Sequence, residues 1–279
     1  MEKKLTAQGP RKRKSYTVTL PIEWVKEYKL DKTRSVDLEL VGSKAVVSAK
    51  RSSLEQVRID GDLARNNLIK ILQSLYRTGV ADIEVTFSEP MIATEILEIV
   101  ERALLGYEIV EQRKGYVHIQ EIFEESSSSF KTILRRIFLL ALELAGGDTN
   151  TVSADRTIKK LINYAQRTLM KKGHSEYKKV PLYYLILDRI EKLCDELKWI
   201  REIEQKPPFP YEQITELLRN AYLLLFTFDE KVYQRCQFQS YELKNQVKRG
   251  KQTPLMTHLH NSARILNSLY ADIYAVIHA

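Results

Sequence analysis

The residues best suited to bind a charged ligand form a basic run near the N-terminus. A Gly-Pro pair at positions 9 and 10 opens a loop whose next residues are Arg11, Lys12, Arg13 and Lys14. Positive side chains at this density can neutralise the phosphates of a nucleic acid. A short basic run is equally compatible with a solvated loop or a localisation signal. The surrounding sequence is therefore needed to choose between these interpretations.

The net charge of the chain is concentrated in the same region. Residues 1–51 contain 13 Lys and Arg against 6 Asp and Glu, whereas the whole chain of 279 residues contains 44 against 36. The first segment therefore carries +7 of the total of +8 and leaves +1 for the remainder. A basic excess confined to one short segment is typical of a contact with nucleic acid or another anionic surface.

Alternating residues predict short strands around the basic loop. Lys3–Ala7 is a strand candidate, and Ser15–Leu20 alternates apolar side chains with hydroxyl-bearing ones. A proline at position 21 suits the first position of a helix, which predicts a helix over Ile22–Tyr28 with Ile22 and Val25 facing inward. A further alternating pair of segments around Gly42-Ser43 predicts a β-hairpin.

This order of strand, basic loop, strand, short helix and hairpin resembles the SpoVT/AbrB swapped-hairpin family over residues 3–50. The resemblance implies a homodimer in which two protomers interleave into one small β-barrel that contacts double-stranded DNA. About fifty residues with few bulky apolar groups cannot bury a sufficient core alone, which agrees with pairing. The expected DNA-binding residues are Lys3, Lys4, Arg11, Lys12, Arg13, Lys14, Ser15, Tyr16 and Thr17. The family's acidic Gly-Asp before the third strand is replaced here by Thr33-Arg34-Ser35.

The rest of the chain divides into two further predicted domains. After the domain over residues 1–52, residues 53–124 show a β-α-β-α-β-β pattern, which predicts a small α+β module without a catalytic cluster. Residues 125–279 show helical periodicity in two groups of three helices, separated by Pro207-Pro208-Phe209-Pro210. The predicted fold class is therefore multidomain α+β, ending in an antiparallel helical bundle built from two three-helix repeats.

The full arrangement resembles the archaeal PhoU-like phosphate uptake regulators over nearly the whole chain. That resemblance implies acidic residue pairs on the bundle helices that bind metal. Glu191 and Asp195 are one such pair and are weak candidates for a metal site, because i,i+4 spacing places both carboxylates on one helix face. Lys159 stands near a position where an acid is expected. The alternative is that the pair forms a solvated helix flank, since one carboxylate pair rarely holds a metal.

Other chemistry is sparse. The sequence contains no P-loop, dinucleotide fingerprint, zinc spacing or Ser/His/Asp arrangement, so we expect no enzyme activity and no cofactor. The two cysteines, Cys194 and Cys236, lie within helical patterns and are expected to be buried thiols. The most apolar stretches are too short to cross a bilayer and the start lacks an apolar region, which predicts a cytoplasmic protein without membrane insertion.

These observations predict a homodimeric DNA-binding transcriptional regulator, acting on phosphate uptake genes as the resemblance implies. A protein partner on the helical bundle is compatible with this prediction. One alternative is a non-catalytic signalling adaptor of phosphate transport that acts through protein contacts. A second alternative is a weakly specific, nucleoid-type DNA binder.

Overall fold

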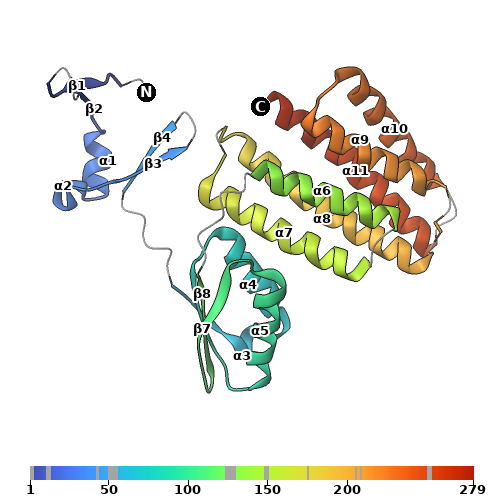
Figure 1. The fold of residues 1–279 in the computed structure, drawn as a ribbon, viewed down its shortest axis with the longest axis horizontal. Helices are drawn as coiled ribbons and strands as arrows, with labels where there is room; N and C mark the ends of the chain where they lie inside the picture. Colours follow the sequence, from blue (N-terminus) through green and yellow to red (C-terminus); the bar gives the residue numbers. More distant parts are fainter. Residues whose placement is uncertain are drawn as a thin grey trace. The chain divides into compact units, whose positions relative to one another are not determined.

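The chain divides into two compact units, Met1–Ser53 and Leu54–Ala279 (Figure 1). Both are taken from a computed structural model. The structure describes residues 3–10, 14–41, 44–49, 56–122, 130–147, 151–174, 176–204, 206–207, 209–249 and 253–279.

The N-terminal unit consists of two antiparallel strand pairs and two short helices. In chain order these elements are β1 (Thr6–Gln8), β2 (Ser15–Thr17), α1 (Ile22–Glu27), α2 (Leu30–Thr33), β3 (Asp37–Val41) and β4 (Lys44–Ser48). β1 pairs with β2, and β3 pairs with β4. The predicted strands, helix and hairpin all occur, although the first two strands are shorter than predicted. The predicted turn residues Gly42 and Ser43 lie outside the described residues.

The second short helix, α2, was not predicted. Lys29 and Arg34 flank it with φ values of 54° and 50°, in the left-handed region that non-glycine residues seldom adopt. Neither residue type signals this conformation in a sequence. Arg34 belongs to the Thr33-Arg34-Ser35 segment in which the chain departs from the SpoVT/AbrB pattern, so the altered turn is part of a short helical element.

A single chain of the N-terminal unit has almost no hydrophobic core. Leu30, at 7% exposure, is its one buried apolar residue among those described. α1 buries no side chain, and Ile22 is 62% exposed, so the prediction that Ile22 faces a core is wrong for the single chain. The two strand pairs are separate two-stranded sheets, and the described residues of one chain form no closed barrel.

The second unit begins with the predicted α+β module. Its elements are β5 (Val57–Asp60), α3 (Gly61–Ala64), a 3₁₀ turn (Arg65–Asn67), α4 (Leu68–Thr78), β6 (Asp82–Thr86), α5 (Met91–Ala103), β7 (Tyr107–Arg113) and β8 (Tyr116–Glu121). The strands form one sheet in the order β5-β6-β8-β7, in which β5 and β6 are parallel and the other pairs antiparallel.

Alternation along the two central strands of this sheet separates a core face from a polar face. Ile83 and Val85 of β6 lie beside Ile119 and Val117 of β8, and all four are fully buried in one cluster with apolar residues of α4 and α5. On the other face His118 Nε2 lies 2.8 Å from Asp82 Oδ1. One side of the sheet therefore packs on helices while the other carries polar pairs.

Six helices form the remainder of the second unit, as the periodicity predicts. They are α6 (Phe130–Gly146), α7 (Thr151–Lys172), α8 (Lys179–Ile203), α9 (Tyr211–Phe226), α10 (Glu230–Arg249) and α11 (Pro254–His278). All six helices contribute to one hydrophobic core, so the two groups of three share their interior. Cys194 and Cys236 are buried free thiols, as predicted, and burial raises the pKa of Cys194.

A polar ridge on α7 joins the module to the helical bundle. The α7 ridge consists of four residues that lie on one face of the helix: Lys160, Asn163, Arg167 and Lys171. Lys160 Nζ donates to the carbonyl oxygen of Glu101 at 2.8 Å. Asn163 Nδ2 donates to the carbonyl oxygen of Ala103 at 3.4 Å. Both carbonyls lie in the last turn of α5, where backbone acceptors lack intrahelical partners and carry partial negative charge.

Arg167 and Asn163 are equally deeply buried on the α7 ridge, each at 1% exposure. Arg167 Nη1 donates to the carbonyl oxygen of Tyr76 near the end of α4 at 2.7 Å. Its Nη2 lies 2.8 Å from Glu121 Oε2, and Lys171 Nζ lies 2.8 Å from the same oxygen. The guanidinium also sits 5.0 Å and 4.8 Å from the ring centres of Tyr76 and Tyr107. The ridge thus stabilises the C-terminal ends of α4 and α5.

In the described part of the chain, no helix is both long enough and apolar enough to cross a membrane.

Candidate nucleic-acid interface

The predicted DNA-binding residues lie on and around the β1–β2 hairpin. The antiparallel register pairs Gln8 with Ser15 at the loop end of the hairpin. Lys14 directly precedes β2 and so lies at this end. Arg11, Lys12 and Arg13 lie outside the described residues.

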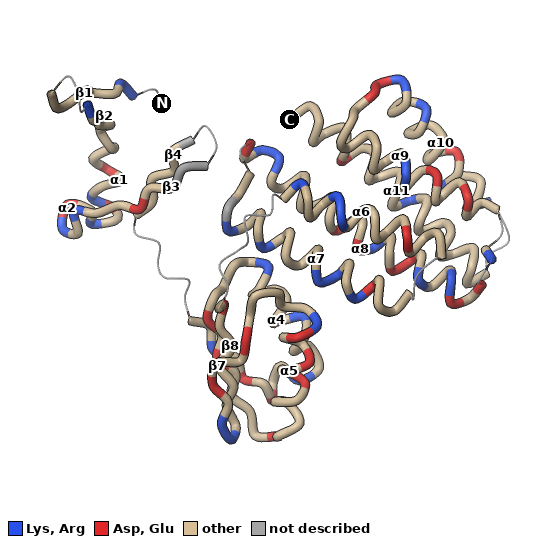
Figure 2. The backbone as a smooth tube through the Cα atoms, in the orientation of Figure 1, with Lys and Arg blue, Asp and Glu red and all other residues tan. Residues whose placement is uncertain are grey.

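Three predicted lysines are described, and all are exposed. Lys3, Lys4 and Lys14 make no ion pair with any described residue, and the hairpin segments carry no Asp or Glu (Figure 2). The register pairs Thr6 with Thr17 at the end away from the loop, and Lys3 and Lys4 extend beyond that pair. The lysines are therefore distributed along the hairpin rather than gathered beside the loop.

The three predicted hydroxyl residues differ in what their protons already contact. Ser15 Oγ donates to the carbonyl oxygen of Gln8 at 3.3 Å, and Thr17 Oγ1 donates to that of Thr6 at 3.2 Å. Both protons are used inside the hairpin. Tyr16 is exposed and has no such bond in the described part of the chain, so its hydroxyl can still donate to a phosphate oxygen.

The same unit exposes an unusual number of large apolar side chains. Those that are described are Leu5, Tyr16, Val18, Ile22, Tyr28, Val36, Leu38 and Val46. Scattered single exposures are normal on protein surfaces, but here they occur in a unit that buries little else. Burying them would release roughly 25 cal/mol per Å² of apolar area, so the unit gains stability from any partner that covers them.

Lys159 lies between two acidic residues of the bundle, Asp155 and Asp195. Its ammonium group occupies the position that a metal cation would need. Its Nζ is 3.1 Å from Asp155 Oδ1 and 2.7 Å from Asp195 Oδ1. Burial by itself would lower the Lys159 pKa, but the hydrogen bond and the charge of Asp195 outweigh it and the pKa is raised. The lysine therefore stays protonated and neutralises both aspartates.

Glu191 faces a different cation. Its Oε1 lies 3.9 Å from Arg77 Nη2 of α4. Burial raises the Glu191 pKa, and the nearby Arg77 charge opposes that rise. Glu191 is thus partly buried beside Arg77, whereas Asp195 is paired with Lys159 and keeps a side chain that is 44% exposed. Among the described residues no group of three or more potential ligands is arranged to hold a metal.

The α7 ridge was not predicted from the sequence. Its residues recur with the i, i+3 and i, i+4 spacing that defines a helix face, but polar residues with this spacing normally indicate a solvated surface. The only available signal was the arginine at position 167 among apolar neighbours, Ala165 and Leu169, that belong to the core stripe.

Comparisons with protein-family models, with curated proteins and with solved structures found no match to this chain.

Proposed function

We propose that the chain is a cytoplasmic, homodimeric DNA-binding transcriptional regulator that contacts duplex DNA through its N-terminal unit. The proposal rests on where the positive charge of the chain lies and on the exposure of the side chains that carry it. The N-terminal segment holds nearly all of the net positive charge, and its described hairpin lysines are exposed without acidic partners. Lysines free of internal partners can neutralise phosphates and release counterions when DNA binds.

The second element of the proposal is pairing of two N-terminal units. The exposed apolar residues of this unit include Ile22 and Leu38, and a single chain buries only Leu30 among the described residues. A second copy would supply the missing core, as the resemblance to the SpoVT/AbrB family implies. A twofold axis would also double the number of cations that meet the duplex, which increases the salt dependence of binding.

The third element is the regulated process. The resemblance to PhoU-like proteins suggests control of phosphate uptake genes, and the organisation of the chain into a basic N-terminal unit and a helical bundle is compatible with it. A regulator of few promoters should bind its operator at least roughly 10³ times more tightly than random DNA, whereas a nucleoid-type binder should not. Crosslinking the protein to DNA across the genome would distinguish few promoters from most of the chromosome.

A salt titration tests the DNA contact directly. The slope of log affinity against log salt should be steep for the parent protein, and replacing Arg11, Lys12, Arg13 and Lys14 by alanine should flatten it by about 0.9 for each lost phosphate contact. The matched control removes the same charge, two Arg and two Lys, from exposed positions of the second unit. These are Arg156, Arg264, Lys70 and Lys231.

The control variant should keep the parent's slope. Equal affinity of the parent and the Arg11–Lys14 variant at every salt concentration would contradict the proposal. Equal flattening by both variants would show that overall charge, and not the N-terminal unit, drives binding.

A further inference from the structure

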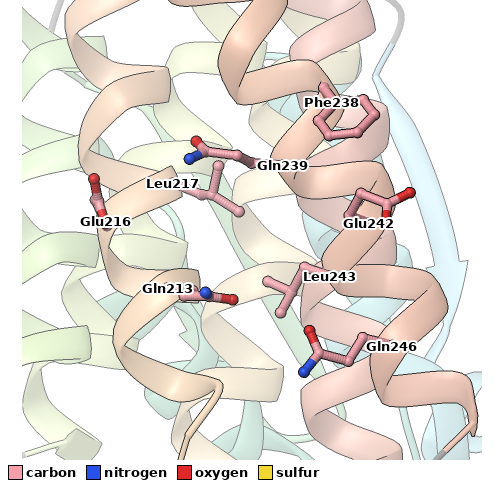
Figure 3. Close-up of a pocket in the computed structure, with 8 residues that line it drawn as sticks. All are labelled: Gln213, Glu216, Leu217, Phe238, Gln239, Glu242, Leu243 and Gln246. Carbon is pink, nitrogen blue, oxygen red and sulfur yellow. The ribbon is translucent and has the colours of Figure 1, made fainter.

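A groove between α9 and α10 forms a small cavity of about 170 Å³ on the helical bundle (Figure 3). Leu217 of α9 and Leu243 of α10 point into this groove from opposite sides. Both are buried members of the bundle core. They give the cavity an apolar floor large enough to contact the hydrocarbon part of one side chain.

Three amide side chains line the groove above this floor. Gln213 comes from α9, and Gln239 and Gln246 come from α10 (Figure 3). All three are exposed, and none has a side-chain hydrogen bond within the described part of the chain. Their carbonyl oxygens are therefore free to accept hydrogen bonds from an N–H donor.

Two carboxylates lie at the same groove, one from each helix. Glu216 of α9 and Glu242 of α10 are exposed, and neither lies within ion-pair distance of a described cation. Phe238, one turn before Glu242, is 65% exposed and lines the groove as well. Two carboxylates, one from each helix, and an exposed aromatic ring are therefore among the residues that line the groove, at whose base lie Leu217 and Leu243.

This combination matches the chemistry of a guanidinium group. An arginine side chain has an apolar stem, five N–H donors in a planar fork and a cationic face that stacks on aromatic rings. An anionic ligand would be repelled by Glu216 and Glu242, and a purely apolar one would leave the amides without partners. We propose that the α9–α10 groove binds an arginine side chain presented by a partner protein.

The charge of the groove also separates this contact from DNA binding. A duplex is a polyanion, so the two carboxylates exclude it from the groove while the N-terminal unit attracts it. The partner contact therefore stands independently of the proposed DNA contact.

The test uses the full-length protein and a defined probe. The probe is an acetylated, amidated hexapeptide with one arginine flanked by leucine and alanine, and its matched control replaces arginine by citrulline, which has the same shape without the charge. Binding is followed by NMR on ¹³C-methyl-labelled leucines. We expect saturable shifts at Leu217 and Leu243 with the arginine peptide and roughly tenfold weaker binding of the citrulline peptide.

Three protein variants test the site. The double substitution Glu216→Gln and Glu242→Gln should weaken binding of the arginine peptide roughly tenfold while leaving the thermal midpoint unchanged, because both residues are exposed. Its control makes the same charge change on the same two helices at Glu212→Gln and Glu230→Gln and should bind as the parent does. Phe238→Ala should weaken binding about threefold through loss of the cation–π contact.

Three results would overturn the inference. Equal binding of the citrulline and arginine peptides would show that the groove does not recognise the charge. Unchanged binding by the Glu216 and Glu242 variant would place the arginine elsewhere. Tighter peptide binding after replacement of Arg11 to Lys14 by alanine would show that the chain's own basic loop fills the groove, not a partner protein.

Discussion

Lys14 in the N-terminal unit and Arg167 on α7 carry the same charge in opposite surroundings. Arg167 is buried and bonded to the Tyr76 carbonyl and the Glu121 carboxylate. Lys14 is exposed and has no acidic partner among the described residues. A buried cation bonded to groups of the same chain stabilises the fold, whereas an exposed cation without acidic partners is available to an external anion.

Apolar residues differ between the two units in the same way. The second unit has two continuous cores of buried apolar residues, one in the module and one in the bundle. The N-terminal unit leaves Ile22 and Leu38 exposed. The unit with the most unsatisfied groups is therefore the one we expect to associate, with DNA through its charges and with a second copy through its apolar residues.

The largest effect should follow from removing the buried cation. Arg167→Met would leave the Glu121 carboxylate with Lys171 alone and the Tyr76 carbonyl without this donor. Breaking a buried ion pair from one side costs about 3–5 kcal/mol of unfolding free energy. Urea denaturation should show this loss for the second unit, and Arg156→Met, an exposed arginine on the same helix, should change stability by less than about 0.5 kcal/mol.

A loss of stability equal to that of the Arg156 control would mean that the α7 ridge does not hold the module. Arg167 would then not have the structural role that distinguishes it from the exposed Lys14.

A smaller effect is expected at the apolar surface of the N-terminal unit. Ile22→Asp should weaken homodimer formation by about 2 kcal/mol or more, because pairing would bury a carboxylate where a large apolar side chain belongs. Sedimentation over a dilution series measures this association. Leu63→Asp, at a position 87% exposed in the second unit, is the control and should leave it unchanged. A parent protein that is monomeric at all concentrations would contradict pairing.

The smallest effect concerns the Glu191 carboxylate, which lies beside Arg77. Burial raises the Glu191 pKa above its ordinary 4.5, so the folded state holds this proton more tightly than the unfolded chain. Stability should therefore rise as the pH falls from neutral toward that value. Glu191→Gln should remove this contribution.

The measurement compares urea denaturation of parent and variant at neutral and mildly acidic pH. Glu202→Gln, an exposed position on the same helix, serves as the control and should retain the parent's pH dependence. A Glu191 variant that follows the parent's curve would show that this carboxylate titrates as if solvated.

Much of the fold could be predicted because its signals are local. Helical periodicity between glycine and proline breakers indicated the six bundle helices, and alternation indicated β3, β6 and β8. Left-handed residues such as Lys29 and Arg34 could not be predicted, because nothing in their side chains favours that conformation over an ordinary one.

The sites were less predictable than the elements. The basic run was visible because its charge is adjacent in the sequence. The α7 ridge and the polar lining of the α9–α10 groove consist of polar residues spaced along helices, and such residues have the same pattern whether they face water or another element. Lys159 shows the difference, since only the fold reveals that it neutralises Asp155 and Asp195.

The hydrogen bonds between α7 and the C-terminal ends of α4 and α5 limit which fragments of this protein can be produced separately. Excision of residues 54–122 would remove the side-chain donors that α7 supplies to the Tyr76, Glu101 and Ala103 carbonyls. A transplanted module would have to bring that helix with it. Transfer of the α+β module to another protein would therefore require transfer of α7 as well.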